Sequence, residues 1–185
     1  MTDLPPLQTR RLRLRPMTAD DAGHIVRWRN APHVAAMMSA ARDAPLTAEE
    51  HLSWFERTRS HRIDYIIELR PTSRPIGTLS LDWRHCPPNQ ACAESGRMIG
   101  ERWALGRSYA KEAAFAWMDF AFRRLGLDWV YARTQADNAA NLAISKALGF
   151  QTQPWPDWLE HPQGEWVFSV LSRDTWQPQK VDVAL

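Results

Sequence analysis

The sequence predicts an α/β or α+β fold in which a mixed sheet is flanked by helices. Two observations predict it. Segments with the two-residue period of strands alternate with helical patterns in the middle of the chain, and no internal repeat is present. The 185 residues are enough for one sizeable core. We therefore expect a single domain over residues 1–185, with its core at about 7–171 and a tail at 172–185.

The N-terminal part predicts one strand and two helices. Residues 9–15 alternate leucine with arginine, which indicates a strand with one solvated face that ends at a proline. A helix is expected over residues 18–30. A second helix is expected to begin at Thr47, because Thr47 and Glu50 have the spacing of a capping box. Residues 31–46 have no clean period, so they predict a loop or a broken helix.

Three strands are expected next. Residues 63–69 and 76–83 flank a turn that contains two prolines and a serine, which is typical of a hairpin. Residues 91–100 predict the third strand. Gly96 within it indicates a bulge or a ligand that passes close to the backbone.

The C-terminal part has the strongest helical period of the chain. Apolar residues recur at helical spacing over residues 114–125. A strand is expected at 128–134, followed by a helix that Asp137 or Asn138 caps and Gly149 ends. A closing strand is expected at 164–171, after a loop rich in proline and tryptophan.

Composition excludes several classes of function. A net charge of +2 is too small to indicate a nucleic-acid partner, and no 18-residue apolar run predicts a membrane span. Neither the six histidines nor Cys86 and Cys92 have the spacing of metal ligands, so no metal is expected. The N-terminus lacks the apolar segment of a secretory signal. We therefore expect a cytoplasmic protein whose two cysteines are reduced.

The turn that precedes the strongest helix is a candidate anion site. Gly106, Ser108 and Ala110 are small, and Arg107 adds a positive charge. The first amide groups of a helix have no partner within the helix, and the helix dipole favours an anion beside them. The alternative is an ordinary strand-to-helix connection.

Two further sets of residues are candidates for ligand binding and for catalysis. Asn138, Asn141 and Ser145 share one face of a predicted helix, which suits a ligand that carries amide groups. The alternative is a solvated face with an N-cap. Glu94 lies in the strand before the anion turn, where a carboxylate in a cleft would be suited to act as a general base. The alternative is a strand residue that faces solvent.

Taken in order, these motifs resemble the GCN5-related N-acetyltransferase (GNAT) superfamily over nearly the whole chain. The opening LQTRRLRLRPMTADDA is similar to the Rim-type branch, which acetylates the N-termini of ribosomal proteins. AESGRMIGERWALGRSYAKEA resembles the fourth strand, the pyrophosphate turn and the third helix of the family. The stretch that ends in KALGF resembles the following strand and helix.

The resemblance implies a mixed, mostly antiparallel sheet that is splayed between strands four and five. Acetyl-CoA, the co-substrate, would lie in that splay. The residues implied to bind it are Met98 and Ile99 through their backbone groups, the turn residues Leu105, Gly106, Arg107, Ser108, Tyr109 and Ala110, and Asn138 and Asn141 on the following helix. Glu94 stands where many members place a general base, which often acts through water.

The sequence departs from the family pattern at three positions. Trp103 replaces the usual glutamine or arginine, and Ser108 replaces the second glycine of the phosphate turn. Ser145 stands where many members carry a tyrosine that protonates the leaving thiolate. Ser145 is therefore the expected catalytic residue at that position, with solvent or Tyr109 as the alternative acid. Rim-type members often have serine at the position of Asn141.

A second, local resemblance concerns the acceptor site. The stretch RWRNAPHVAAMMSAARDAPLTAEEHLSWFER is similar to acetyltransferases of nucleotide-linked amino sugars, including the enzyme of pseudaminic acid synthesis. The residues that it implies for substrate binding are Trp28, Arg29, Asn30 and Met38. The alternative is that these residues only pack two helices together.

We therefore expect an N-acetyltransferase that transfers acetyl to a primary amine by direct attack. The acceptor is expected to be an amino sugar, nucleotide-linked or free, or a protein N-terminus, and the protein a monomer or a homodimer. Two alternatives are open. One is an acyl-CoA-binding sensor or interaction module that has lost catalysis, and the other is a nucleotide-binding α/β domain of another kind.

Overall fold

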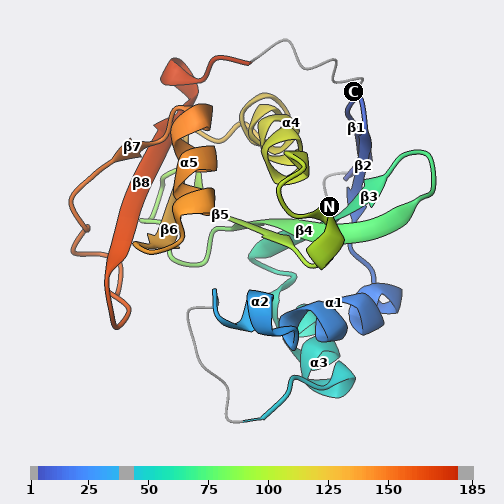
Figure 1. Ribbon diagram of the computed structural model, residues 1–185. Coiled ribbons are helices and arrows are strands. Elements are labelled where there is room, and N and C mark those ends of the chain that lie inside the picture. Colours follow the sequence, from blue (N-terminus) through green and yellow to red (C-terminus); the bar gives the residue numbers. More distant parts are fainter. Residues whose placement is uncertain (1–3, 38–43, 179–185) are drawn as a thin grey trace.

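The computed structural model describes residues 4–37 and 44–178. One eight-stranded sheet runs through it in the order β1-β2-β3-β4-β5-β6-β8-β7 (Figure 1). Every neighbouring pair of strands is antiparallel except β5 (Cys92–Ile99) and β6 (Trp129–Gln135), which are parallel. The expected mixed, mostly antiparallel sheet is confirmed.

The first strand is shorter than predicted. The Thr9 hydroxyl accepts a hydrogen bond from the Leu12 amide at 3.0 Å, which turns the chain between β1 (Leu7–Gln8) and β2 (Leu12–Pro16). These two strands pair with each other, and β2 then pairs with β3 (Arg62–Leu69). The predicted hairpin is present as β3 and β4 (Arg74–Asp82).

Three helices cover one face of the sheet (Figure 1). They are α1 (Ala22–Arg29), α2 (Pro32–Ala35) and α3 (Ala48–Thr58). The helix predicted over residues 18–30 begins with a 3-10 turn, Ala19–Asp21, and continues as α1. The predicted capping box of α3 is confirmed, because the Thr47 hydroxyl accepts from the Glu50 amide at 3.2 Å and the Glu50 carboxylate accepts from the Thr47 amide at 2.8 Å.

The opposite face carries α4 (Tyr109–Arg123) and α5 (Ala139–Leu148), as Figure 1 shows. The main core lies beneath them, where Trp117 and Phe120 of α4 pack against Tyr65 of β3 with ring centroids 4.7 and 5.8 Å apart. The core also extends past Leu171, where the sequence predicted a tail. Trp176, which follows β8 (Trp166–Ser172) and the 3-10 turn Arg173–Thr175, packs against Phe115 and Phe122 of α4.

The two cysteines correct one prediction. The loop between β4 and β5 brings Cys86 and Cys92 to a Cα–Cα distance of 5.9 Å, and their sulfurs form a disulfide. The expectation of a reduced pair was wrong, since the linear spacing did not reveal this fold-back. No helix in the described part of the chain is long and apolar enough to cross a membrane.

Candidate active site

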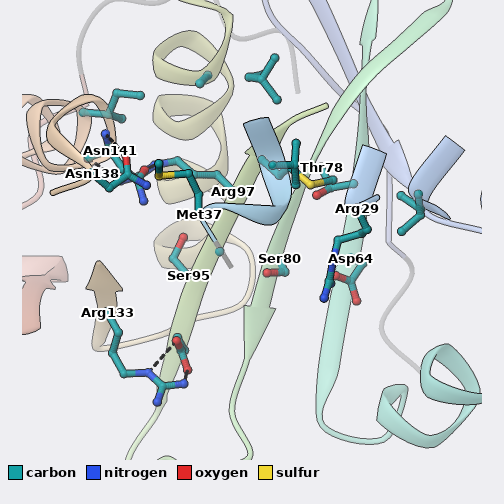
Figure 2. A pocket seen from close by; sticks show the side chains of 18 of the residues that line it. Arg29, Met37, Asp64, Thr78, Ser80, Ser95, Arg97, Arg133, Asn138 and Asn141 are labelled. Atoms are coloured by element: carbon teal, nitrogen blue, oxygen red, sulfur yellow. Dashed lines mark hydrogen bonds and ion pairs between the residues drawn. The ribbon is translucent and has the colours of Figure 1, made fainter. Parts of the chain in front are cut away.

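The parallel strands β5 and β6 separate part-way along their length. Their pairing runs from Cys92 opposite Trp129 to Glu94 opposite Tyr131 and then stops, although both strands continue for several residues. The expected splay is therefore present. A cavity of about 390 Å³ lies there, lined from α1, α2 and α3 on one side and from β5 and α5 on the other (Figure 2). We call it the splay cavity.

The anion turn lies at one end of the splay cavity. Gly106 and Ser108 both adopt the left-handed region, with φ of 72° and 61°. This conformation turns the chain from the 3-10 turn Arg102–Ala104 into α4, and the Ser108 hydroxyl makes no capping hydrogen bond. Leu105 and Ala110 line the cavity, whereas the four residues between them, which were also predicted to bind the cofactor, do not. The amides that begin α4 suit the oxygens of a phosphate.

An acidic residue in the first turn of α4 is neutralised by the N-terminal strands. The Glu112 carboxylate accepts from the Thr9 hydroxyl at 2.6 Å and from the Arg11 Nε at 2.6 Å. Burial opposes ionisation, yet these hydrogen bonds keep the pKa of Glu112 below its ordinary value. Arg11 also donates to the backbone oxygen of Arg107 at 3.1 Å and lies 4.5 Å from the ring centre of Tyr109. Arg11 thus supports the turn as well as offsetting the carboxylate.

Alternate residues of β5 direct their backbone N–H and C=O groups toward the splay. The Gly100 amide donates to the Ile76 oxygen at 2.9 Å, and the Met98 carbonyl oxygen lies against the Cα of Gly77 in β4. Because backbone groups of an antiparallel strand alternate in direction, Arg97 and Ile99 turn theirs toward the splay. The direction of the Ile99 backbone is compatible with its predicted contact to the cofactor, which stays a prediction. The Met98 backbone faces β4 instead, although Met98 also lines the cavity.

Glu94 lines the cavity at the point where the strands separate. Both of its carboxylate oxygens accept from the Arg133 guanidinium, at 2.9 and 2.8 Å (Figure 2). The sequence predicted Glu94 without this partner, because Arg133 lies 39 residues further along the chain. The pair fixes the orientation of the Glu94 carboxylate.

The three polar residues of α5 lie as predicted on the face toward the splay. The Asn138 side chain accepts from the Asn141 amide at 3.1 Å and so caps the helix. The Asn141 side-chain oxygen accepts from Arg97 Nε, and Ser145 Oγ accepts from Arg97 Nη2 at 2.5 Å. Both amide nitrogens of the asparagines remain as donors, and Asn138 and Asn141 line the cavity.

The cavity wall formed by α1 and α3 is aromatic and charged. His51 is buried and stacks on Trp54 with ring centroids 5.6 Å apart, and burial keeps the pKa of His51 below its ordinary value. Arg62 lies 5.0 Å from the ring centre of Trp54 and holds Asp64 through a hydrogen bond of 2.9 Å. Arg29, which was predicted to bind the acceptor, lines the same wall, and its role stays a prediction.

Two predicted substrate residues have structural roles instead. Trp28 is buried, its Nε1 donates to Glu101 at 3.0 Å, and its ring lies where a Cβ on Gly100 would be. The Asn30 side chain donates to the Leu46 oxygen at 2.9 Å and accepts from the Leu46 amide at 2.8 Å, so it joins α1 to the segment before α3. Neither lines the cavity. Met38 lies outside the described residues.

Sequence reasoning missed Arg97 and Glu101. Glu101 accepts from the side chains of Arg27, Trp28 and Trp103, at 2.5, 3.0 and 2.9 Å. The available signal was position, since Arg97 lies between Gly96 and Met98 and Glu101 directly follows the predicted strand over residues 91–100. In the described residues, no group of three or more metal-ligating side chains is gathered.

Comparison with known proteins identifies the family. A family model described as an acetyltransferase (GNAT) domain matches residues 11–151, which is more than half of the chain. The chain therefore belongs to the GNAT family of N-acetyltransferases, in agreement with the resemblance seen in its motifs. An uncharacterized N-acetyltransferase, p20 of Bacillus licheniformis, is 26% identical over 181 residues, which cover 91% of this chain and 97% of that protein.

Solved structures share the fold at low identity. RimJ of Mycobacterium smegmatis, in complex with CoA-disulfide, has a TM-score of 0.75 at 18% identity and covers 95% of this chain and 89% of its own. The ribosomal-protein-S5-alanine acetyltransferase of Vibrio fischeri has a TM-score of 0.74 at 18% identity, with coverage of 94% and 100%. Spermidine N-acetyltransferase of Vibrio cholerae, with CoA and spermine, has a TM-score of 0.74 at 15% identity, with coverage of 89% and 96%.

Proposed function

We propose that this chain transfers acetyl from acetyl-CoA to a primary amine by direct attack, without a covalent enzyme intermediate. The observation that carries the proposal is the splay cavity, which connects the anion turn at the start of α4 with the carboxylate of Glu94. When bound, acetyl-CoA supplies the activated acetyl group. The CoA complexes of the RimJ and spermidine acetyltransferase structures support this donor.

The residues proposed to bind the donor follow the cavity from one end to the other. Backbone amides from Gly106 to Ala110, with the side chains of Arg107 and Ser108, suit the pyrophosphate. The backbone of Ile99 and the amide side chains of Asn138 and Asn141 suit the amide groups of the pantetheine arm. The backbone N–H groups of β5 that face the splay are placed to polarise the acetyl carbonyl.

Glu94 is proposed to remove the first proton from the acceptor. A primary amine has a pKa near 10, so at neutral pH it arrives as an ammonium and cannot attack until deprotonated. A carboxylate oxygen has two lone pairs, so each oxygen of Glu94 can accept from a water while it also accepts from Arg133. Arg133 is then a positioning residue that fixes the direction of the carboxylate.

Replacing Glu94 by glutamine should lower kcat by about 10²–10⁴, because glutamine has the same shape but accepts no proton. Steady-state rates from pH 6 to 10 test this. The wild-type rate should fall at low pH, and the variant should recover part of its rate as the amine deprotonates by itself. Affinity for acetyl-CoA, measured by calorimetry, should stay within about threefold of wild type. A variant with the wild-type rate across that pH range removes Glu94 from this role.

The acceptor that suits the cavity carries one amine on a neutral or anionic molecule. Asp64 and Glu94 line the cavity, and each already accepts two or more hydrogen bonds from an arginine. Neither has its charge available for the additional ammonium groups of a polyamine such as spermidine. Two acceptor types meet this condition, an amino sugar, free or nucleotide-linked, and a protein N-terminus.

Different observations favour the two acceptors. The name of the Vibrio fischeri neighbour gives alanine of ribosomal protein S5 as its acceptor, which favours a protein N-terminus. The aromatic pair His51 and Trp54, beside Arg29, separates the splay cavity from a second hollow on α3, and this arrangement favours a sugar carried on a nucleotide.

An assay of thiol release over a panel of amines tests the function. The panel contains a nucleotide-linked amino sugar, a free amino sugar, an alanine-initiated peptide, a serine-initiated peptide and spermidine. Release with a sugar or a peptide, confirmed by mass spectrometry of the product, supports the proposal and assigns the acceptor. Binding of acetyl-CoA with no release for any amine favours the sensor that has lost catalysis. Absence of acetyl-CoA binding overturns the donor assignment.

A further inference from the structure

Arg97 is a cation in the splay cavity with no carboxylate beside it. Its guanidinium reaches from β5 to α5 beside Asn141 (Figure 2). There Nη2 donates to the Asn141 backbone oxygen at 3.0 Å and to Ser145 Oγ at 2.5 Å. Two other arginines of the cavity, Arg62 and Arg133, form ion pairs with Asp64 and Glu94. Within residues 4–37 and 44–178, no ion pair neutralises Arg97.

Placing a guanidinium there without a counter-ion is costly. Removal from water lowers the pKa of Arg97 to about 10, which still leaves it protonated at neutral pH. The hydrogen-bond acceptors of its guanidinium are neutral. They are the side-chain oxygen and the backbone oxygen of Asn141 and the hydroxyl of Ser145. A buried charge of this kind favours an anion in the adjacent space.

The order of residues along β5 shows where that anion would be. From the anion turn toward Glu94, the strand presents Ile99, then Arg97, then Ser95, over about 13 Å at the usual strand rise. The acetyl carbon must lie near Glu94 for an amine deprotonated there to attack it. The sulfur is bonded to that carbon on the side of the turn, which places it at the level of Arg97.

We propose that Arg97 is a catalytic residue that stabilises the thiolate leaving group of coenzyme A, with the Ser145 hydroxyl as a second donor. This inference rests on the proposed function. Because Ser145 Oγ accepts from Arg97, the hydroxyl proton of Ser145 is left to donate to a second group. The site then needs no side chain that gives a proton to the sulfur, which accounts for a serine at the position where many relatives have a tyrosine.

The step balances without such an acid. The ammonium of the acceptor loses one proton to Glu94, and its nitrogen forms a bond to the acetyl carbon. The carbon–sulfur bond breaks, and its electron pair remains on sulfur beside Arg97. The nitrogen releases its second proton to solvent. The products are the amide, the CoA thiolate and two protons, and the thiolate takes up a proton after it leaves the site.

The thiol pKa of bound CoA tests this inference without turnover. The other charged and titratable groups that line the cavity are the pairs Glu94–Arg133 and Asp64–Arg62, together with Arg29, His33 and His51, whereas α5 and its cap present only the neutral side chains of Asn138, Ala140, Asn141 and Ile144. A cation near the sulfur lowers a thiol pKa by about 1–3 pH units. We expect the thiolate absorbance of CoA bound to the wild-type protein to titrate lower than that of free CoA by this amount.

Two variants at Arg97 separate charge from packing. In Arg97→Gln the thiol of bound CoA should titrate as in free CoA, kcat should fall by about 10²–10³, and the affinity for acetyl-CoA should change by less than about threefold. Arg97→Lys keeps the charge and should retain most of the lowered thiol pKa. Arg124→Gln removes an exposed arginine at the end of α4 and serves as the control that leaves all three quantities unchanged.

The outcomes distinguish the two levels of the proposal. Arg97→Gln could lower the affinities for acetyl-CoA and for CoA equally and leave the thiol pKa of bound CoA as it is in the wild-type protein. In that case Arg97 binds the pantetheine arm or the phosphates, and the inference is overturned. If the wild-type protein binds CoA but does not lower its thiol pKa, the inference is also overturned, while the proposed function stands. If the wild-type protein binds no CoA, the proposed function itself fails.

Discussion

Glu101 shows how one buried carboxylate can join three parts of the site. Its side chain accepts from Arg27 and Trp28 of α1 and from Trp103 in the turn that leads to α4. Burial opposes its ionisation, but these hydrogen bonds lower the pKa of Glu101 to about 2. The acceptor-side helix and the anion turn are therefore attached to the end of β5 through one ionised group.

Replacing Glu101 by glutamine should destabilise the protein by about 1–3 kcal/mol at pH 7, since Arg27 loses its counter-ion and one amide donor meets only donors. Urea denaturation followed by tryptophan fluorescence measures the change. Glu160→Gln removes an exposed carboxylate and should shift the midpoint little. Equal midpoints for the two variants would contradict the role of Glu101.

At the scale of elements, the N-terminal strands support the start of α4. Arg11 neutralises Glu112, which otherwise places a negative charge beside the amides proposed to bind pyrophosphate. Arg11→Gln should therefore raise the dissociation constant for acetyl-CoA about three- to tenfold with kcat changed by less than twofold. Calorimetry measures the first quantity and thiol release the second.

The matched control for this prediction is Arg13→Gln. Arg13 lies two residues further along the same stretch, points away from α4 and contacts Glu68 at 3.5 Å. Its replacement should leave the affinity for acetyl-CoA unchanged. An equal loss of affinity in both variants would mean that the net charge of the protein, and not the contact with Glu112, sets the effect.

Elements whose signals are local were predicted from the sequence. The capping box of α3, the glycine turn before α4 and the caps of α5 depend on residues three or four apart, and each is present. The splay was reached through the family resemblance. The position of Asn141 and Ser145 on the face of α5 toward β5 also follows from helical spacing.

Features that depend on tertiary contacts were not predictable in this way. The direction of the Met98 backbone depends on the register of β5 against β4, and the burial of Trp28 depends on how closely α1 approaches Gly100. The pairs of Glu94 with Arg133 and of Arg97 with Ser145 join residues 39 and 48 apart in the chain. No periodicity reports such distances, so the electrostatics of the site came only from the structure.

At the scale of the whole molecule, arginine–carboxylate pairs fasten the elements to one another. Of the 23 basic residues, 20 are arginine, whose planar group can hold two oxygens at once. Arg15 binds Asp21 before α1 and Glu68 of β3, and Arg62 binds Asp64 and Asp82 on β3 and β4. The net charge of +2 does not show how many of these charges form ion pairs.

These pairs predict that the protein loses stability in acid. The pKa of Glu101 is lowered from 4.5 to about 2, and hydrogen bonds outweigh burial to lower the pKa of Asp21, Asp82 and Glu112. The unfolded chain takes up protons on these groups at higher pH than the folded chain does. Their contribution to stability is therefore complete above about pH 5 and is lost as the pH falls toward 2.

Buried His51 adds a loss that begins earlier, because burial lowers its pKa below 6.5 and the unfolded chain protonates first. The free energy of unfolding should thus decline slightly from pH 7 to 5 and steeply from pH 5 to 3. Urea denaturation at each pH measures it, and Glu101→Gln should flatten the steep part, since one of the responsible carboxylates is gone. A wild-type stability that is constant from pH 7 to 3 would show that these pairs are equally protonated in both states, and that packing alone holds the sheet to its helices.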